Sequence, residues 1–138
     1  MEDSRAYGIA QKKMLNQDAF SLWLGAELLE IGEGHCKLKM KVRKEMTNGF
    51  GIAHGGISYS LADSALAFAS NAYGKMAVSI ETSISHLVKV KVGETLFADA
   101  VEINRTEKIG IYEVEVKNNT GLLVSKFKGT VYISSKEW

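Results

Sequence analysis

The chain has 138 residues, 46% of them hydrophobic and 24% charged, which is long enough to bury a core without metals or disulfides, so one domain over residues 1–138 is expected. Its formal net charge of +1 lacks the basic footprint of a nucleic-acid-binding protein, and no nucleic-acid partner is expected. One cysteine excludes an internal disulfide and no stretch reads as a signal peptide or membrane span, so the default expectation is a cytoplasmic protein with no membrane contact.

The first third of the chain predicts short helices followed by a hairpin. Residues 1–23 form an N-terminal helical segment, with one helix over 4–15 and a second helical stretch over 17–24 that acts as a flap or packing element. A strand over 27–31 turns at a glycine pair and returns over 35–42. In the returning strand apolar residues alternate with lysines, which is typical of a half-buried antiparallel hairpin.

The middle of the chain predicts one long buried helix that carries a single carboxylate. Residues 57–72 are apolar on every face, which is the pattern of a helix covered on all sides. Between Glu45 and Lys75 the only formally charged residue is Asp63. Because an ionised group in such surroundings is costly to desolvate, Asp63 is the best indication of a functional site.

The start of this helix is a second candidate for chemistry. His54, Gly55 and Gly56 stand where free backbone N–H groups and the positive end of the helix dipole can receive an anion or a developing oxyanion. Asp63 lies eight residues after Gly55, roughly 12 Å along a helix axis, so the two groups cannot meet within one straight helix. If both act on one reacting group, they must come from two subunits.

The rest of the chain predicts strands. Gly74 is a helix stop, and strands follow over 76–90, 94–104, 109–117 and 122–134, which we interpret as a β-meander. The predicted fold class is α+β, with one antiparallel sheet of roughly five or six strands wrapped around one long central helix.

A set of short motifs identifies a family resemblance. They are Asn48-Gly49, His54-Gly55-Gly56, Ser60-Leu61-Ala62-Asp63, Gly74 and Ala77-Val78-Ser79. In this order and spacing they resemble the hotdog-fold acyl-CoA thioesterases of the PaaI type, and the resemblance covers about residues 24–133. It implies a homodimer with sheets continuous across the interface, often a dimer of dimers that makes a homotetramer, with active sites between subunits and no cofactor.

The resemblance assigns roles to matching positions in this chain. Asp63 resembles the catalytic carboxylate, which acts as a general base on water or as a nucleophile. The N–H of Gly55 would hold the thioester carbonyl, the Asn48 side chain would orient the water or the substrate, and His54 would neighbour the leaving group. Ser79 aligns with a hydroxyl that positions water from the partner subunit.

Contacts with an acyl-CoA substrate are expected from Gly56, Tyr59, Lys89 and Lys91. The family commonly carries an Arg-Pro pair after the long strand, but residues 86–90 contain no proline, which implies rearranged contacts with the coenzyme phosphates. Any single basic side chain is better explained as part of a solvated strand edge or turn. The basic candidates also include Arg105, Lys108, Lys126 and Lys128, and the aromatic residues that leave the acyl group open between aryl and medium aliphatic are Tyr59, Phe68 and Tyr73.

Each site residue also has a purely structural interpretation. Asp63 could be a buried helix carboxylate satisfied by the hydroxyl of Ser60 or Ser64, and His54 could cap its own loop. The glycines could serve only a tight helix start, Asn48 a plain turn, and Ser79 a strand face.

Two other functions on the same fold remain open. One is a non-catalytic acyl-CoA-binding or regulatory hotdog protein. The other is an enoyl-CoA hydratase or dehydratase, which the His-Gly-Gly start of the helix disfavours. No metal site is expected, because His35, His86 and Cys36 are interpreted as isolated.

Overall fold

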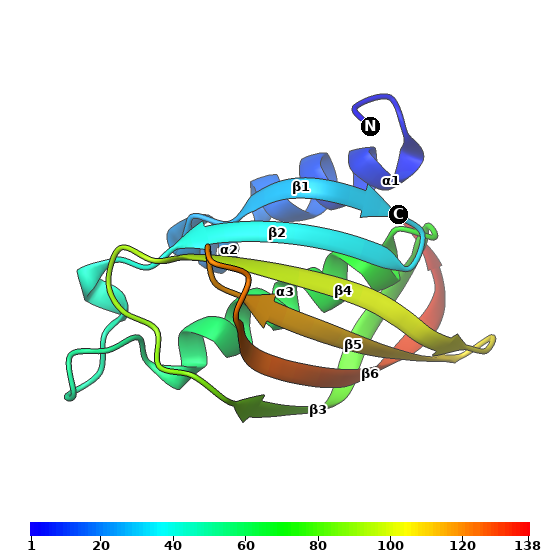
Figure 1. The fold of residues 1–138 in the computed structure, drawn as a ribbon. Helices are drawn as coiled ribbons and strands as arrows, with labels where there is room; N and C mark the ends of the chain where they lie inside the picture. The colour runs from blue at the N-terminus through cyan, green and yellow to red at the C-terminus, as the bar shows by residue number, and fades with distance from the viewer.

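The computed structural model describes all of residues 1–138 and contains one antiparallel sheet packed against one long helix (Figure 1). The sheet has six strands in the order β1-β2-β4-β5-β6-β3, and hydrogen-bonded neighbours are antiparallel. The strands are β1 (Glu27–Gly32), β2 (His35–Lys41), β3 (Lys75–His86), β4 (Thr95–Arg105), β5 (Ile109–Lys117) and β6 (Leu123–Glu137). This confirms the predicted α+β class and the predicted hairpin.

The long helix is α3 (Gly55–Asn71), which begins slightly earlier than predicted. Its Ala- and Leu-rich sequence favours a helix, and its fully buried side chains form a common core with inner residues of the sheet. Asp63 and Ala67, four residues apart, lie on a half-buried face turned toward the N-terminal segment. None of the helices has both the length and the apolar character needed to cross a membrane.

The N-terminal segment covers that half-buried face of α3. The predicted helix over 4–15 is in fact α1 (Arg5–Tyr7), a π-helical stretch (Gly8–Met14) and a 3-10 turn (Leu15–Gln17), followed by α2 (Ala19–Leu24). The Ser21 hydroxyl of α2 lies 2.8 Å from the Ser64 hydroxyl of α3. The segment therefore packs on the long helix rather than extending away from it.

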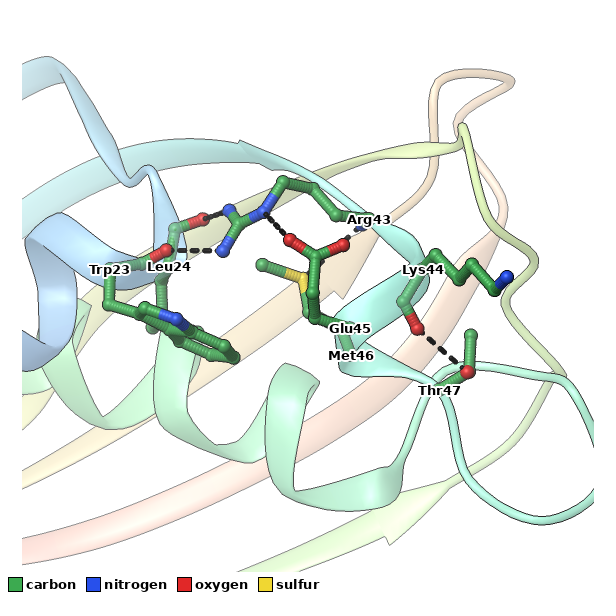
Figure 2. Close-up of polar contacts among 7 residues, drawn as sticks. All are labelled: Trp23, Leu24, Arg43, Lys44, Glu45, Met46 and Thr47. Atoms are coloured by element: carbon green, nitrogen blue, oxygen red, sulfur yellow. Dashed lines mark hydrogen bonds and ion pairs between the residues drawn. The ribbon is translucent and has the colours of Figure 1, made fainter.

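Arg43 fixes the end of α2 to the chain that follows β2 (Figure 2). Its guanidinium donates to the carbonyls of Trp23 at 2.6 Å and Leu24 at 3.1 Å, which satisfies two terminal acceptors of α2. It also lies over the Trp23 ring, 5.0 Å from its centroid, and donates to Glu45 at 3.3 Å. These contacts hold the aromatic end of α2 beside the start of α3.

Strand β3 departs from the predicted meander. It pairs with β6 at the edge of the sheet rather than with β4, so only β4, β5 and β6 form a meander. It ends at His86 rather than at residue 90, because the N–H groups of Leu87 and Val88 both turn to the carbonyl of Val124. The chain then crosses past the start of α3 to reach β4 beside β2 (Figure 1).

Candidate active site

The start of α3 leaves one backbone donor free. His54 is the N-cap, and its Nδ1 accepts a hydrogen bond from the Gly56 N–H at 2.8 Å. The His54 carbonyl accepts from the Ile57 N–H at 2.9 Å. The Gly55 N–H between them has no partner within the chain, as expected in the first turn of a helix. The capping role of His54 is therefore real, and it leaves Gly55 available to a ligand.

A cavity of about 290 Å³ opens at this donor. Asn48 lines it, and its Oδ1 accepts from the Phe50 N–H at 2.9 Å, while its amide nitrogen has no partner in the chain. Lys89 also lines this cavity, on the segment that follows β3. We call it the donor cavity; its other lining residues are Ile52, Ala53, His54, Gly55, Ser58, His86, Leu87, Val88, Val90, Leu96 and Ser125.

His86 is a residue of this cavity that the sequence interpretation missed. Its Nδ1 lies 3.4 Å from both the Ser58 hydroxyl and the Ser125 hydroxyl. Its Nε2 would lie only 3.0 Å from a Cβ placed on Gly55. The prediction that His86 is isolated is wrong, because its partners come from positions 28 and 39 residues away in the sequence.

Asp63 lies in a different cavity of about 430 Å³, which we call the carboxylate cavity. The Asp63 carboxylate makes no hydrogen bond or ion pair within the chain, and the Ser64 hydroxyl, one of its expected partners, bonds to Ser21 instead. Burial raises the pKa of the Asp63 carboxyl above its usual value. Ser79 lines the same cavity; the other lining residues are Met14, Leu66, Ala67, Asn71, Met76, Ala77, Val78, Val131 and Trp138.

The donor cavity and the carboxylate cavity share no lining residue. Gly55, Asn48 and His54 lie together in the first, while Asp63 and Ser79 lie together in the second. One chain therefore brings the expected site residues into two groups rather than one.

The remaining predicted substrate residues lie outside both cavities. Gly56 lines a separate groove with Phe20 and Trp23. The Tyr59 hydroxyl lies 2.6 Å from the Thr82 hydroxyl. Lys91 is exposed, and its N–H bonds to the Glu94 carboxylate. Of the four residues expected to contact the substrate, only Lys89 lines the donor cavity beside Gly55.

Two other charged candidates, Arg105 and Lys126, have partners inside the chain. Arg105 lies over the Tyr73 ring, 3.8 Å from its centroid. Lys126 pairs with Glu113 at 3.3 Å and with Glu115 at 3.7 Å. His35 is not isolated, since its Nε2 lies 2.9 Å from the Asp99 carboxylate, but no group of three or more His, Cys, Asp or Glu residues is arranged to hold a metal ion.

Comparison with known proteins identifies the family. The thioesterase superfamily model matches residues 50–125. A protein of Archaeoglobus fulgidus is 46% identical over 117 residues, which cover 85% of this chain and 75% of the relative. The acyl-coenzyme A thioesterase PaaI of Escherichia coli is 34% identical, over 84% of this chain and 83% of its own.

The solved structures agree. The structure of E. coli PaaI has a TM-score of 0.93 at 32% identity, and the match covers 96% of both chains. A Streptococcus mutans protein solved with bound acetyl CoA has a TM-score of 0.79 at 26% identity, covering 82% of this chain and 91% of its own. The chain therefore belongs to the thioesterase superfamily, and it is a PaaI-type hotdog thioesterase.

Proposed function

We propose that the protein hydrolyses an acyl-CoA thioester to a free acid and coenzyme A at a site built from two copies of the chain. The observation that carries the proposal is the pair of unsatisfied groups on α3: a free Gly55 N–H in one cavity and an unpartnered Asp63 carboxylate in another. The similarity to E. coli PaaI supports the substrate class.

The donor cavity binds the thioester carbonyl in this proposal. The Gly55 N–H donates to the carbonyl oxygen, and a donor of this kind contributes on the order of 3 kcal/mol to the transition state. The free amide nitrogen of Asn48 orients the water or the substrate. Because Nδ1 of His54 accepts from Gly56, its neutral ring carries the proton on Nε2, which can donate a hydrogen bond beside the leaving group.

The partner subunit's Asp63 completes the reaction as general base or nucleophile. As a base it accepts the proton of a water whose oxygen attacks the carbonyl carbon, and the C–S bond then breaks to release coenzyme A. Burial raises its pKa, which makes it a stronger base than an exposed Asp. Ser79, in the same cavity, positions the water.

Edge strand β3 supports a dimer. Its outer edge has no neighbour in the sheet, and Val78 and Ile80 on it are 63% and 59% exposed. Long apolar edges of this kind are rarely left open to solvent. A second copy paired along β3 would extend the sheet and cover Val78, which lines the carboxylate cavity. A homotetramer formed as a dimer of dimers, and a cytoplasmic location, stay predictions.

The carboxylate cavity is the proposed place for the acyl group, since most of its lining side chains are apolar. Phe68 is fully buried in the core and Tyr73 bonds to Glu102, so neither reaches this cavity. Met14 and Trp138 are the residues that would select the acyl group instead.

A thiol-release assay over aryl, short, medium and long acyl-CoAs tests the proposal. We expect turnover of at least one class and no hydration of enoyl-CoA. Tight acyl-CoA binding without release of thiol would support the regulatory binding protein instead. An Asp63→Ala variant as active as the wild type would rule out the proposed mechanism.

A further inference from the structure

His86 lies between the proposed carbonyl donor, Gly55, and the segment along which the coenzyme arm would leave. Its Nε2 lies against Gly55, within 3.0 Å of a Cβ placed there, and Gly55 is the proposed carbonyl donor. His86 is also the first residue of the segment 86–90, which lines the donor cavity and along which a coenzyme arm would leave. A sulfur atom bonded to the carbonyl carbon and continuing into that arm would lie next to the imidazole.

The hydroxyl groups around His86 determine which ring nitrogen faces the cavity. The Ser58 hydroxyl donates to the Gly55 carbonyl at 3.4 Å, and the Ser125 hydroxyl donates to the Ser58 oxygen at 3.2 Å. Each hydroxyl has one proton, so in this arrangement neither donates to the imidazole. With the hydroxyl protons arranged in this way, Nδ1 of His86 is the donor toward these oxygens, and Nε2 is the nitrogen that can exchange a proton in the cavity.

His54 cannot exchange a proton in the same way. Its Nδ1 accepts from Gly56, so a second ring proton there would break the helix cap. Loss of the Nε2 proton from its neutral ring would create an imidazolate. His54 can therefore donate a hydrogen bond but cannot cycle through an imidazolium, whereas His86 keeps its Nδ1 bonds in both the neutral and the protonated form.

We infer that His86 is the proton donor to the departing sulfur of coenzyme A, a role that rests on the proposed thioesterase function. When the tetrahedral intermediate collapses, the C–S bond breaks and its electron pair goes to sulfur. The imidazolium Nε2–H of His86 transfers its proton to that sulfur, which leaves as a thiol. The neutral ring then takes a proton from solvent, and Ser58 and Ser125 hold its orientation throughout.

The test compares two leaving groups on the same acyl group. One substrate is the acyl-CoA; the other is the thioester of a nitro- and carboxyl-substituted arylthiol, whose thiolate leaves without a proton. In His86→Gln the amide can donate a hydrogen bond but cannot transfer a proton. We expect kcat/KM for acyl-CoA to fall about 100-fold, while that for the aryl thioester changes by less than about 3-fold. Ser125→Ala should give a smaller loss with the same dependence on the leaving group.

His35→Gln is the matched control, because His35 lies on β2 bonded to Asp99 and lines neither cavity. It should leave both substrates unaffected. Equal losses for the two thioesters in His86→Gln would mean that His86 only shapes the site, and would overturn the inference while leaving the thioesterase function standing. A wild-type protein that hydrolyses neither thioester would overturn both.

Discussion

Two carboxylates on the inner elements of this fold, Asp63 and Glu102, have opposite surroundings. The Glu102 side chain on β4 accepts hydrogen bonds from the hydroxyls of Tyr73 and Tyr112, both at 3.0 Å, and lies 3.9 Å from Nε of Arg105. The Asp63 carboxylate on α3 has no partner in the chain and opens into a mostly apolar cavity.

The difference separates a structural carboxylate from one held ready for a ligand. Burial, followed by the bond to Glu102, raises the pKa of both tyrosines, so their hydroxyls stay protonated and keep donating. Burial alone raises the pKa of Asp63. A half-buried carboxylate with no partner in the chain, facing a mostly apolar cavity, is typical of a site whose partner is a ligand or another chain.

The largest effect expected from this contrast is the loss of catalytic activity in the Asp63→Asn variant. The amide has nearly the same shape but cannot accept a proton or attack a carbonyl, so kcat should fall on the order of 1000-fold. Thiol release under saturating acyl-CoA measures it. Glu102→Gln is the control, and its kcat should stay within about 3-fold of wild type, because Glu102 serves packing rather than chemistry. Equal losses in the two variants would remove the distinction between the carboxylates.

Mixed dimers test whether Asp63 and Gly55 of one chain serve different sites. Gly55→Ala places a Cβ about 3.0 Å from His86 Nε2, on the wall of the donor cavity, and we expect it to displace the thioester from the Gly55 N–H. When Asp63→Asn and Gly55→Ala chains are combined, each mixed dimer contains one doubly altered site and one intact site. Random 1:1 mixing should therefore restore about one quarter of wild-type activity.

The control for this experiment is Gly49→Ala, whose added Cβ would meet nothing within 4 Å, so it should be active alone. If the mixture stays as inactive as its two components after subunit exchange, each site is completed within one chain and the two-subunit site is refuted.

The parts of the fold that follow local patterns could be predicted from the sequence. Cys36, Leu38 and Met40 alternate with lysines, and each is buried on β2 as expected. The place of β3 could not be predicted, because alternation along a strand does not say which neighbour it pairs with. The π-helical turns of residues 8–14 could not be predicted either, because the spacing of apolar residues does not distinguish α- from π-helical turns.

The candidate site shows the same division. The separation of Gly55 and Asp63 followed from the rise of a helix, and they do lie in separate cavities. His86 was missed because its two hydroxyl partners lie on α3 and β6, and only the crossing of the chain after β3 brings the three together. A histidine that directly precedes a predicted substrate-binding loop was the one signal available.

A smaller effect is expected on stability in Glu102→Gln. A glutamine keeps one acceptor oxygen, so one of the two tyrosine hydroxyls loses its acceptor and faces an amide N–H, and the interaction with Arg105 weakens. Tyr112 is fully buried, so water cannot replace a hydrogen bond that its hydroxyl loses. The free energy of unfolding should fall by about 1–2 kcal/mol, measured by urea denaturation. An unchanged midpoint would show that the cluster adds nothing to stability.

The smallest effect has the opposite sign, and it comes from Asp63→Asn. Burial raises the pKa of Asp63 above 3.8, so the folded chain binds this proton more tightly than the unfolded chain. As pH rises from 3.8 through the raised pKa, the unfolded state releases the proton first, and the folded state loses stability. Asparagine has no such loss, so at neutral pH the variant should melt slightly above wild type, while below pH 3.8 the two should converge. A thermal melting series from acid to neutral pH measures the difference. A variant that melts lower than wild type at neutral pH would show that the Asp63 carboxylate stabilises the fold and is structural, as Glu102 is.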